Sequence, residues 1–586
     1  MGTQNSKLKT QNYRDGAILA LVAACLVILA TLGGGMLAIA YGVRMQAIRT
    51  KNEAVAMLAA EAGYQKAIFW MSQQQDVITA LQEGVPGTSD SLQFAEADCD
   101  YNIEFFTFVG SRPIYRIISE GHSGIFSRTV DVLVFQAISG WDMGMCRVPT
   151  SSSSTDPVNF VAGEIIDMPI HINKYDDNPD VSDIHIIGAP KFLRLVSMSE
   201  SRYTSGGADK YSSIMSRFLG GIVFDQPDSK ITDKDTLTAK ADRFENITAA
   251  GYKFTPAANP LVDNGLPAVQ LEFYVGNDGK GYVRITEDCT VRSYLSSTSS
   301  WDYRINPDGD GTTYEKYPIY GYHYIPEPSA NKRYTTQIDD PSNAIYVSQS
   351  YGDVEGEPGA QIFVNGNVII GSRGENSSTV SQLNTVKGKI SVVASGNIWI
   401  TNELRVAGLH DSNGIPSADN PNVLGLIAHQ GVIKIVDPGM TANELLDPDP
   451  PEGTIGTDIY EPIANLDHSP HAEEHDRELP AQMVVEVALT IGGGGWGAEN
   501  VYRKGGDKDY DRENYNGTSY DELIFIGTIV EAIRGAVGSE VSFKHKNGYK
   551  KYYYFDERLL EGILPGNIWL KGKYLPTPAG WHDYRP

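Results

Sequence analysis

The sequence predicts a mainly β-stranded protein that begins with one long α-helix. Three observations indicate this class. An apolar segment near the N-terminus runs on into an amphipathic stretch, residues 101–135 alternate apolar and polar side chains, and short β-branched segments later in the chain recur around glycines. These patterns are typical of a helix, of half-buried strands and of stacked coils, respectively. We expect a helix on an antiparallel sheet, followed by an irregular right-handed parallel β-helix-like ectodomain.

The first element is a membrane helix over residues 16–43, a segment without a charged side chain. About 20 apolar residues cross a bilayer as a helix, whereas the apolar core of a signal peptide is only about 7–15 residues long. A retained single-pass span is therefore predicted, with residues 1–15 as a cytoplasmic leader. Basic residues flank both ends of the span in nearly equal number, so the charge count does not decide its orientation. We expect the N-terminus in the cytoplasm because the leader is short and the rest of the chain is large and acidic.

Residues 44–83 continue this helix as an amphipathic stalk, with no helix breaker before Gly84. One apolar face is defined by residues that recur every seven positions: Ile48, Val55, Ala62 and Phe69. Residues at this spacing lie on one side of a helix. We expect this face to pack on the protein's own globular domain, and packing on neighbouring subunits is compatible with it.

An antiparallel sheet is expected over residues 93–140. Strand patterns cover residues 101–109, 114–119 and 127–135, and glycine-containing turns separate them. Such a sheet gives the preceding helix a surface on which to bury an apolar face.

Several motifs in this region resemble those of a known family. They are Gly16-Ala-Ile-Leu-Ala-Leu21 after a short basic leader, Ala59-Ala-Glu61-Ala-Gly63, and the strand motifs at residues 115–121 and 128–132. Together they are similar to the start of PilX-type and related type IV pilin-like proteins. The resemblance implies pilus or pseudopilus subunits and an inner-membrane assembly platform as partners, and it makes Gly16 a candidate prepilin cleavage residue and Glu61 a candidate assembly residue.

Leu21 departs from the family pattern. Standard prepilins carry a glutamate at this place, which pairs with the amino terminus of a neighbouring subunit. The tip subunit of type II secretion pseudopili also lacks it. The resemblance therefore implies a minor or tip subunit rather than a major pilin.

The ectodomain follows a serine-rich linker at residues 151–157. Three segments share one template of two β-branched runs around a corner, and their corner glycines are Gly366, Gly396 and Gly431. Such units must stack to bury their apolar faces, and we expect the glycines to supply a left-handed corner conformation. We predict first β coils over 160–250, an insertion over 251–340, a β-helix-like region over 341–565 and a C-terminal tail over 566–586. A β-sandwich is the alternative, because long insertions blur the repeat.

The ectodomain also resembles a family. Its motifs are found at residues 364–368, 393–398, 424–427, 526–538 and 552–559. They look like those of an uncharacterised bacterial family that joins a PilX-like N-terminus to a glycine-rich β ectodomain. This resemblance implies no reaction.

The chain is acidic, with 73 acidic and 48 basic residues and a net charge of −25. Nucleic acid is excluded as a partner, because phosphate binding needs a basic face. The chain has four cysteines. Cys25 lies in the apolar span, and Cys99, Cys146 and Cys289 allow at most one disulfide.

No cofactor is expected. Asp308 and Asp310 lie in a segment that begins like an EF-hand loop, but Tyr317 stands in place of the bidentate glutamate. A β-turn is the expected structure there, with a weak calcium site as the alternative. His471 and His475 fit the H-x-x-E-H pattern, but prolines bracket them in an acidic segment. We expect a surface loop rather than a zinc protease helix.

The function that these observations predict is that of a membrane-anchored, pilin-like structural or assembly protein of a type IV pilus or type II secretion-like system. The expected location is the inner membrane, with the ectodomain in the periplasm or on the cell surface. An anchored adhesin or carbohydrate-binding protein is the main alternative. An anchored polysaccharide lyase or hydrolase is a third, and it rests on fold analogy alone.

Overall fold

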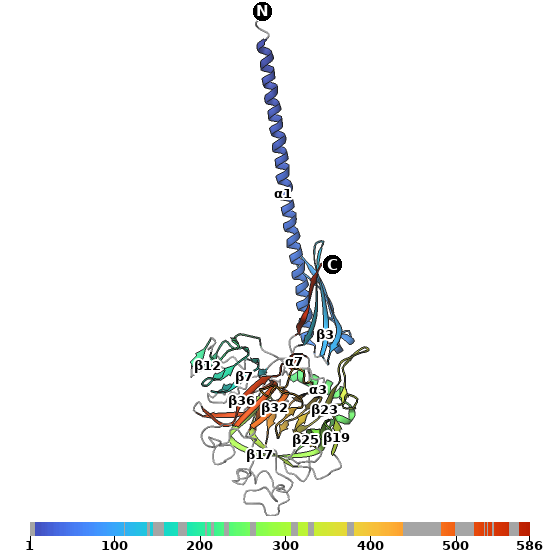
Figure 1. Cartoon of the computed structure of the whole chain (residues 1–586), viewed down its shortest axis with the longest axis vertical. Helices are drawn as coiled ribbons and strands as arrows, with labels where there is room; N and C mark the ends of the chain where they lie inside the picture. Colours follow the sequence, from blue (N-terminus) through green and yellow to red (C-terminus); the bar gives the residue numbers. More distant parts are fainter. Residues whose placement is uncertain are drawn as a thin grey trace, which may run out of the picture. The chain divides into compact units, whose positions relative to one another are not determined.

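The computed structural model describes residues 6–74, 76–110, 112–136, 141–143, 158–173, 184–205, 208–211, 216–227, 234–257, 265–305, 314–325, 333–371, 380–436, 482–498, 521–532, 534–535, 537–541, 544–561 and 574–585. The chain divides into two compact units (Figure 1). Unit 1 comprises residues 1–106, 115–134 and 576–586, and unit 2 comprises residues 107–114 and 135–575. The predicted class, a long N-terminal helix with an otherwise mainly β-stranded chain, is confirmed.

Unit 1 begins with the long helix α1, Ser6–Gln73. The prediction of one uninterrupted helix up to Gly84 is wrong, because the chain leaves the helix after Gln73 and forms a second short helix, α2, at Val77–Gln82. Asp76 is the N-cap of α2, and its side chain accepts a hydrogen bond from the Ile78 amide at 3.0 Å. A carboxylate at this place satisfies an amide that the first helical turn leaves unpaired.

The sheet of unit 1 has five strands in the order β1-β2-β3-β4-β37. Four are consecutive: β1 Ser89–Gln93, β2 Asp98–Val109, β3 Arg112–Ser123 and β4 Phe126–Gln136. The fifth, β37 Tyr574–Tyr584, comes from the C-terminus. The predicted C-terminal tail is therefore wrong for residues 574–584, which complete this sheet. No local pattern in the sequence shows that a distant strand pairs with β4.

Unit 2 consists of coils whose strands pair in parallel. One sheet has the order β14-β11-β8-β5-β34-β32-β30-β27-β23-β15, and a second contains the consecutive neighbours β16-β24-β28-β31-β33. Each of β23, β27, β30 and β32 in the first sheet is followed in sequence by its partner strand β24, β28, β31 or β33 in the second. This strand-turn-strand unit per coil is the arrangement that the repeat predicts, and parallel ladders do not fit a β-sandwich. The handedness stays a prediction.

The strands of the first sheet are β5 Trp141–Met143, β8 Ile170–Ile172, β11 Val196–Met198, β14 Ile222–Val223, β15 Lys253–Phe254, β23 Gly359–Val364, β27 Lys389–Ala394, β30 Val423–Ala428, β32 Gln482–Ile491 and β34 Asp521–Glu531. Beside them lie β7 Ile165–Asp167, β10 Lys191–Phe192, β20 Tyr346–Val347, β35 Gly538–Val541 and β36 Lys544–Phe555. The second sheet contains β16 Gly265–Gly276, β17 Gly281–Ile305, β18 Tyr314–Ile325, β19 Arg333–Gln337, β24 Asn367–Ile370, β25 Val380–Leu383, β28 Ile398–Ile400, β31 Ile433–Ile435 and β33 Trp496–Ala498. Smaller sheets contain β6 Val158–Phe160, β9 Ile184–Ile186, β12 Tyr203–Ser205 and β13 Ala208–Lys210, then β21 Ser350–Tyr351 with β22 Val354–Glu355, and β26 Thr385–Val386 with β29 Arg405–Val406.

The coils are not stacked in simple sequence order. The chain enters the first sheet at β5, beside β34, and moves outward through β8 and β11 to β14. It then crosses to the opposite end at β15 and returns through β23, β27, β30 and β32 to β34. The first and last parts of unit 2 therefore meet in the middle of the sheet, a junction that we call the seam. A buried ion pair lies at the seam, with Lys551 Nζ 3.1 Å from Glu164 Oε1.

The crossing includes helix α3, Lys234–Ile247. The prediction of β coils up to residue 250 is wrong there. Ala241 and Phe244 pack with Phe363, Val393, Val423, Ile427 and Ala488, so α3 covers the outer face of the first sheet. The predicted insertion over 251–340 is also wrong in part, because β15 pairs in parallel with β23, and β16 with β24. These strands form a coil of their own.

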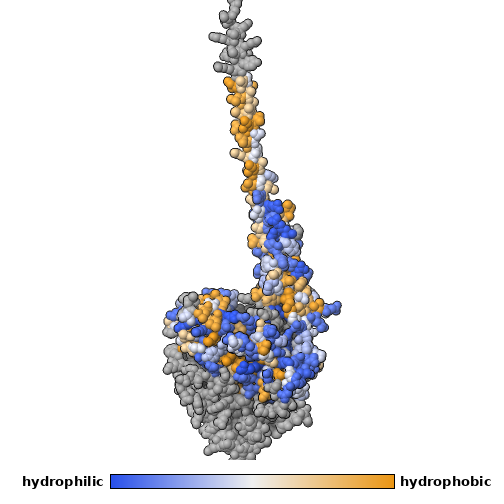
Figure 2. Space-filling view, viewed as in Figure 1, coloured by the Kyte–Doolittle hydropathy of each residue, from blue (hydrophilic) through white to orange (hydrophobic). Residues whose placement is uncertain are grey.

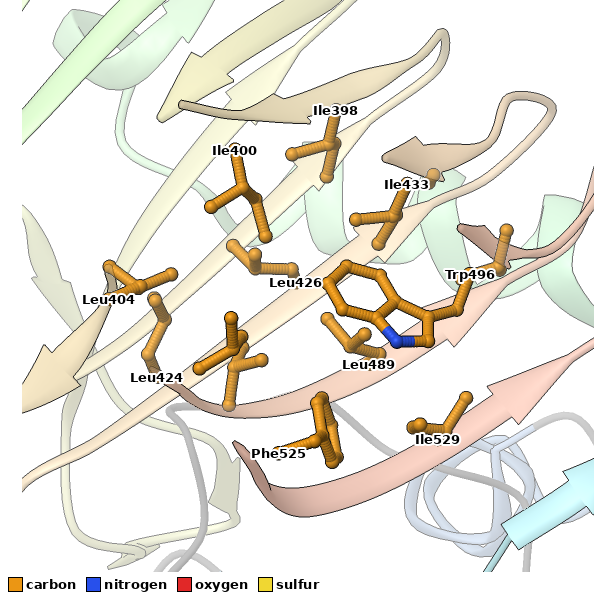
Figure 3. Packing of buried hydrophobic residues seen from close by; sticks show 14 of the residues in the cluster. Ile398, Ile400, Leu404, Leu424, Leu426, Ile433, Leu489, Trp496, Phe525 and Ile529 are labelled. Atoms are coloured by element: carbon orange, nitrogen blue, oxygen red, sulfur yellow. The ribbon is translucent and has the colours of Figure 1, made fainter. Parts of the chain in front are cut away.

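The interior of the coils is filled by large apolar side chains. Figure 3 shows Ile398, Ile433 and Leu489 around the Trp496 ring, with Phe525 below it. Trp496 and Ile433 are fully buried, as are Leu426 and Phe525. Burial of such side chains stabilises a fold by about 1.5–3 kcal/mol each, so the stacked interior is the main source of stability in unit 2.

Gly366, Gly396 and Gly431 lie in the turns between the two strands of successive coils. Of the three, only Gly366 has a positive φ, and its value of 158° is close to extended backbone rather than to the left-handed region. The predicted left-handed corner is therefore not the reason for these glycines. A Cβ on Gly431 would lie 2.2 Å from the carbonyl oxygen of Gly396, and one on Gly396 would lie 2.5 Å from Asn367 Oδ1. Stacked turns approach one another too closely for a side chain.

Candidate membrane and assembly site

The first part of α1 is exposed along its whole length, from residue 16 to residue 51. Among the described residues, α1 contains the one helix long and apolar enough to span a bilayer, with a mean hydropathy of 2.6 in its most apolar window and none of that window buried. Figure 2 shows this part as a hydrophobic rod, above a stretch of mixed polarity. The length and composition therefore suit a membrane span.

Two of the predicted assembly residues lie on this rod. The Leu21 side chain is 66% exposed, and no atom lies within 4 Å of a Cβ built on Gly16. Glu61 is half-buried on the later part of α1. Because a helix rises 1.5 Å per residue, Leu21 and Glu61 are about 60 Å apart, so the three residues do not form one site.

The later part of α1 packs on the sheet through small residues. Ala56, Ala60, Gly63 and Ala67 are buried, and Trp70 closes the contact at its end. The approach is close enough that a Cβ on Gly121 of β3 would lie 2.0 Å from the Ala56 carbonyl oxygen. Backbone therefore meets backbone where the helix crosses the sheet, and only small side chains fit.

The apolar face predicted from the seven-residue spacing is not the buried one. Ile48 is 42% exposed and Phe69 is 61% exposed, and Leu58, on the same side of the helix, is 63% exposed. The expectation that this face packs on the protein's own domain is wrong for these residues. The alanine and glycine spacing at 56, 60, 63 and 67 was the signal that could have identified the buried face. We call Ile48, Leu58 and Phe69 the open face of α1.

Ion pairs surround α1 where it meets the sheet. Arg49 Nε lies 2.9 Å from Glu53 Oε1, and Arg585 Nη2 lies 2.8 Å from the other carboxylate oxygen of Glu53. Lys51 pairs with Glu96 at 2.8 Å. The hydrogen bond from Arg49, with the Arg585 charge beside it, lowers the pKa of Glu53. These ion pairs are at least partly exposed. They help to orient the base of the helix, but each adds little to the stability of unit 1.

The described part of the chain contains no group of three histidine, cysteine, aspartate or glutamate side chains placed to hold a metal ion. The candidates Asp308, Asp310, His471 and His475 lie outside the described residues, and so does Cys146. Cys25 and Cys99 are free thiols, and the buried Cys289 thiol donates a hydrogen bond to the Thr286 carbonyl. Burial raises the pKa of the Cys99 thiol, which keeps it in the unreactive protonated form.

A serine and a histidine meet on neighbouring strands of unit 2. His171 Nδ1 lies 2.9 Å from Ser197 Oγ, and His171 Nε2 lies 3.0 Å from Asn173 Oδ1. The serine hydroxyl also donates to the Ile170 carbonyl at 3.0 Å, and Ser197 and His171 are register partners in a parallel ladder. This geometry is that of a cross-strand hydrogen-bond ladder.

Unit 1 is thus a long helix packed on an antiparallel sheet. No family model matches the chain, and no curated protein matches it. Among solved structures, the competence-associated pilin ComZ from Thermus thermophilus aligns over 91% of this chain and 98% of its own, with 10% identity and a TM-score of 0.24. At that score the two structures differ over most of their length, so the functional argument rests on the residues of this chain.

Proposed function

We propose that this protein is a membrane-anchored, pilin-like structural subunit of a type IV pilus or type II secretion-like assembly. The observation that supports it best is α1, which joins an exposed apolar rod to a stalk whose open face is apolar and uncovered in the single chain. Such a surface is stable in water only when lipid or other protein covers it. The rod suits a bilayer before assembly, and the open face suits the helices of neighbouring subunits after it.

The proposed partners are therefore pilus or pseudopilus subunits, the inner-membrane assembly platform and the lipid bilayer. The proposed location is the inner membrane, with unit 2 in the periplasm or on the cell surface. The motifs around Gly16 and Glu61 support a PilX-type relationship. The proposed role is structural rather than enzymatic, and strand pairing accounts for the hydrogen bonds between His171 and Ser197.

Leu21 supports a minor or tip role. It offers no carboxylate to the amino terminus of a neighbouring subunit, and an unpaired ammonium in an apolar filament core is costly. A subunit with leucine here suits a position where no such amino terminus needs a partner. N-terminal sequencing of the membrane-extracted protein tests whether Gly16 becomes the first residue, and its abundance in a purified filament tests the minor role.

The assembly function is tested by changing the open face. Leu58→Glu with Phe69→Glu places charges on exposed positions, so unit 1 should fold and reach the membrane while co-purification with pilus or pseudopilus subunits falls. Ser89→Glu with Gln93→Glu, at exposed positions of β1 rather than of α1, is the matched control. Unchanged co-purification of the open-face variant would contradict the proposal.

The anchor is tested separately with Leu21→Arg. Leu21 lies inside the apolar run near its N-terminal end, and a charge in such a run costs up to about 2.5–3.5 kcal/mol on insertion scales, the value at the centre of the span. We expect this variant to be lost from the membrane fraction or from the assembly. Full retention and assembly would contradict the anchor.

A further inference from the structure

The C-terminal strand β37 contacts both other components of unit 1. Its neighbour in the sheet is β4, and Asp583 pairs with Arg128 of β4 at 2.8 Å. On α1, the Trp581 ring lies edge-on to the Tyr64 ring, with the centroids 5.0 Å apart. The strand therefore joins the stalk of α1 to the edge of the sheet.

This attachment depends on few contacts. Within β37 only Gly580 is buried, and Trp581 is 40% exposed. Gly580 lies against β4, where a Cβ would be 3.1 Å from the Leu133 carbonyl oxygen. The remaining contacts are the backbone hydrogen bonds to β4, the Tyr64–Trp581 ring contact and partly exposed ion pairs, which are individually weak. An element with so little buried surface detaches more readily than the strands beside it.

The order of the chain gives β37 a special position. Everything from Phe135 to Leu575 belongs to unit 2, so β4 and β37 are separated by the whole ectodomain. The helix α1 and strands β1 to β4 emerge first during synthesis. Until residues 574–584 have been made, the edge of β4 carries unpaired backbone groups, which invite pairing with other chains, and Tyr64 lacks its Trp581 cover.

We propose that β37 is an assembly checkpoint: unit 1 becomes competent to pack with neighbouring subunits only after this strand has docked on β4 and α1. A chain with an unfinished ectodomain then sits in the membrane without entering the filament. This inference rests on the proposed function, because it adds a control on that assembly. The strand itself contacts α1 at Tyr64, which is buried and lies away from the open face. Pro576 and Pro578 fit the role, since prolines on an outer strand discourage further strand addition.

The experiment uses the full chain with Trp581→Ala, Asp583→Ala and Arg585→Ala combined, and His582→Ala as the matched control on the same strand. The first readout is hydrogen exchange in the extracted protein. We expect faster exchange in β4 for the triple variant and unchanged exchange in β27, β30 and β32. The second readout is co-purification with pilus or pseudopilus subunits, which we expect to fall at least about tenfold, the change that 1.4 kcal/mol produces.

A second variant guards against general misfolding. Arg128→Cys with Asp583→Cys places two thiols where an ion pair now joins the strands. The oxidised form should assemble like the unmodified chain, and the reduced form should assemble poorly. Equal assembly of both forms, unchanged exchange in β4, or fast exchange with undiminished assembly overturns the checkpoint while the proposed function stands. If the unmodified chain enters no filament, the proposed function fails and the checkpoint fails with it, even if β37 protects β4.

Discussion

The stalk of unit 1 and the coils of unit 2 make their closest contacts through different kinds of side chain. In unit 1, α1 approaches the sheet through Ala56, Ala60 and Gly63, while Leu58 and Phe69 remain exposed. In unit 2 the interior consists of isoleucine, leucine, valine and aromatic side chains, with Trp496 fully buried. A large apolar residue is therefore a guide to the core in the coils, whereas on the stalk it is either buried, as Trp70 is, or left exposed.

The strongest test of this difference is a pair of aromatic truncations. Trp496→Ala removes a fully buried ring and should destabilise unit 2 by about 3–5 kcal/mol, because the cavity does not fill. Phe69→Ala removes a ring that is 61% exposed and should leave the stability of unit 1 nearly unchanged. Denaturant unfolding, with the transitions of the two units followed separately, provides the measurement. Equal losses in both units would contradict the comparison.

A second test compares a buried ion pair with an exposed one. Lys551 and Glu164 have side chains that are 9% and 1% exposed. Lys551→Met leaves a buried carboxylate without its cation, which should cost about 3–5 kcal/mol. Adding Glu164→Leu should recover much of that loss, because no buried charge then remains.

The matched pair in unit 1 is Lys51 with Glu96, whose side chains are 60% and 63% exposed. Lys51→Met should give no measurable change in the unfolding of unit 1. If Lys551→Met also left the unfolding of unit 2 unchanged, the buried ion pair at the seam would not hold the two ends of the coil stack together.

A third test concerns the stacked glycines. Gly431→Ala brings a methyl group against the backbone of Gly396, and overpacking of this kind costs about 1–3 kcal/mol. Gly251→Ala is the control, since no atom lies within 4 Å of a Cβ at that position. The thermal midpoint of unit 2 distinguishes the two. Equal midpoints would show that the turns can separate to admit a side chain.

The smallest effect is a pH dependence at Glu486, whose side chain is 2% exposed. Burial raises the pKa of this carboxyl above 4.5, and hydrogen bonds from the Val406 amide and His410 offset part of the rise, with the Arg405 charge also near. A raised pKa means that the protonated form is the stabilised one. The contribution of Glu486 to the stability of unit 2 should therefore be highest below pH 4.5 and fall as the pH rises from 4.5 through the raised value.

Glu486→Gln removes this titration. The difference in unfolding free energy between the variant and the unmodified chain should change with pH in that window, by at most about 1.4 kcal/mol per pH unit. A difference that is constant across the window would contradict the prediction.

The sequence predicted the elements well and their partners poorly. The apolar run, the strands of the sheet and the glycine-centred coil template all follow from local periodicity, which depends on neighbouring residues alone. The position of β37 beside β4 could not be predicted, because it joins residues hundreds of positions apart. The seam between β5 and β34 and the packing of α3 on the first sheet could not be predicted for the same reason.

The candidate site divides in the same way. The membrane rod with Gly16 and Leu21 was predicted from composition, since a bilayer span requires only length and apolarity. The buried face of the stalk was missed, because the seven-residue spacing of Ile48, Val55, Ala62 and Phe69 identifies a shared side but not what that side contacts. Helical spacing at Leu237, Ala241 and Phe244 was present for α3, but the strand-rich surroundings obscured it.

The membrane-length helix, the following sheet and the coils that must stack can all be predicted from the sequence, because each is a consequence of side-chain order along a short segment. The buried face of α1, the residues at the end of the sheet and the place where the coil stack closes become known only once the chain is folded. Those outcomes depend on how closely two backbones can approach one another and on which distant strand pairs with the edge of a sheet. The open face of α1 is the result, and it is the surface on which the proposed assembly depends.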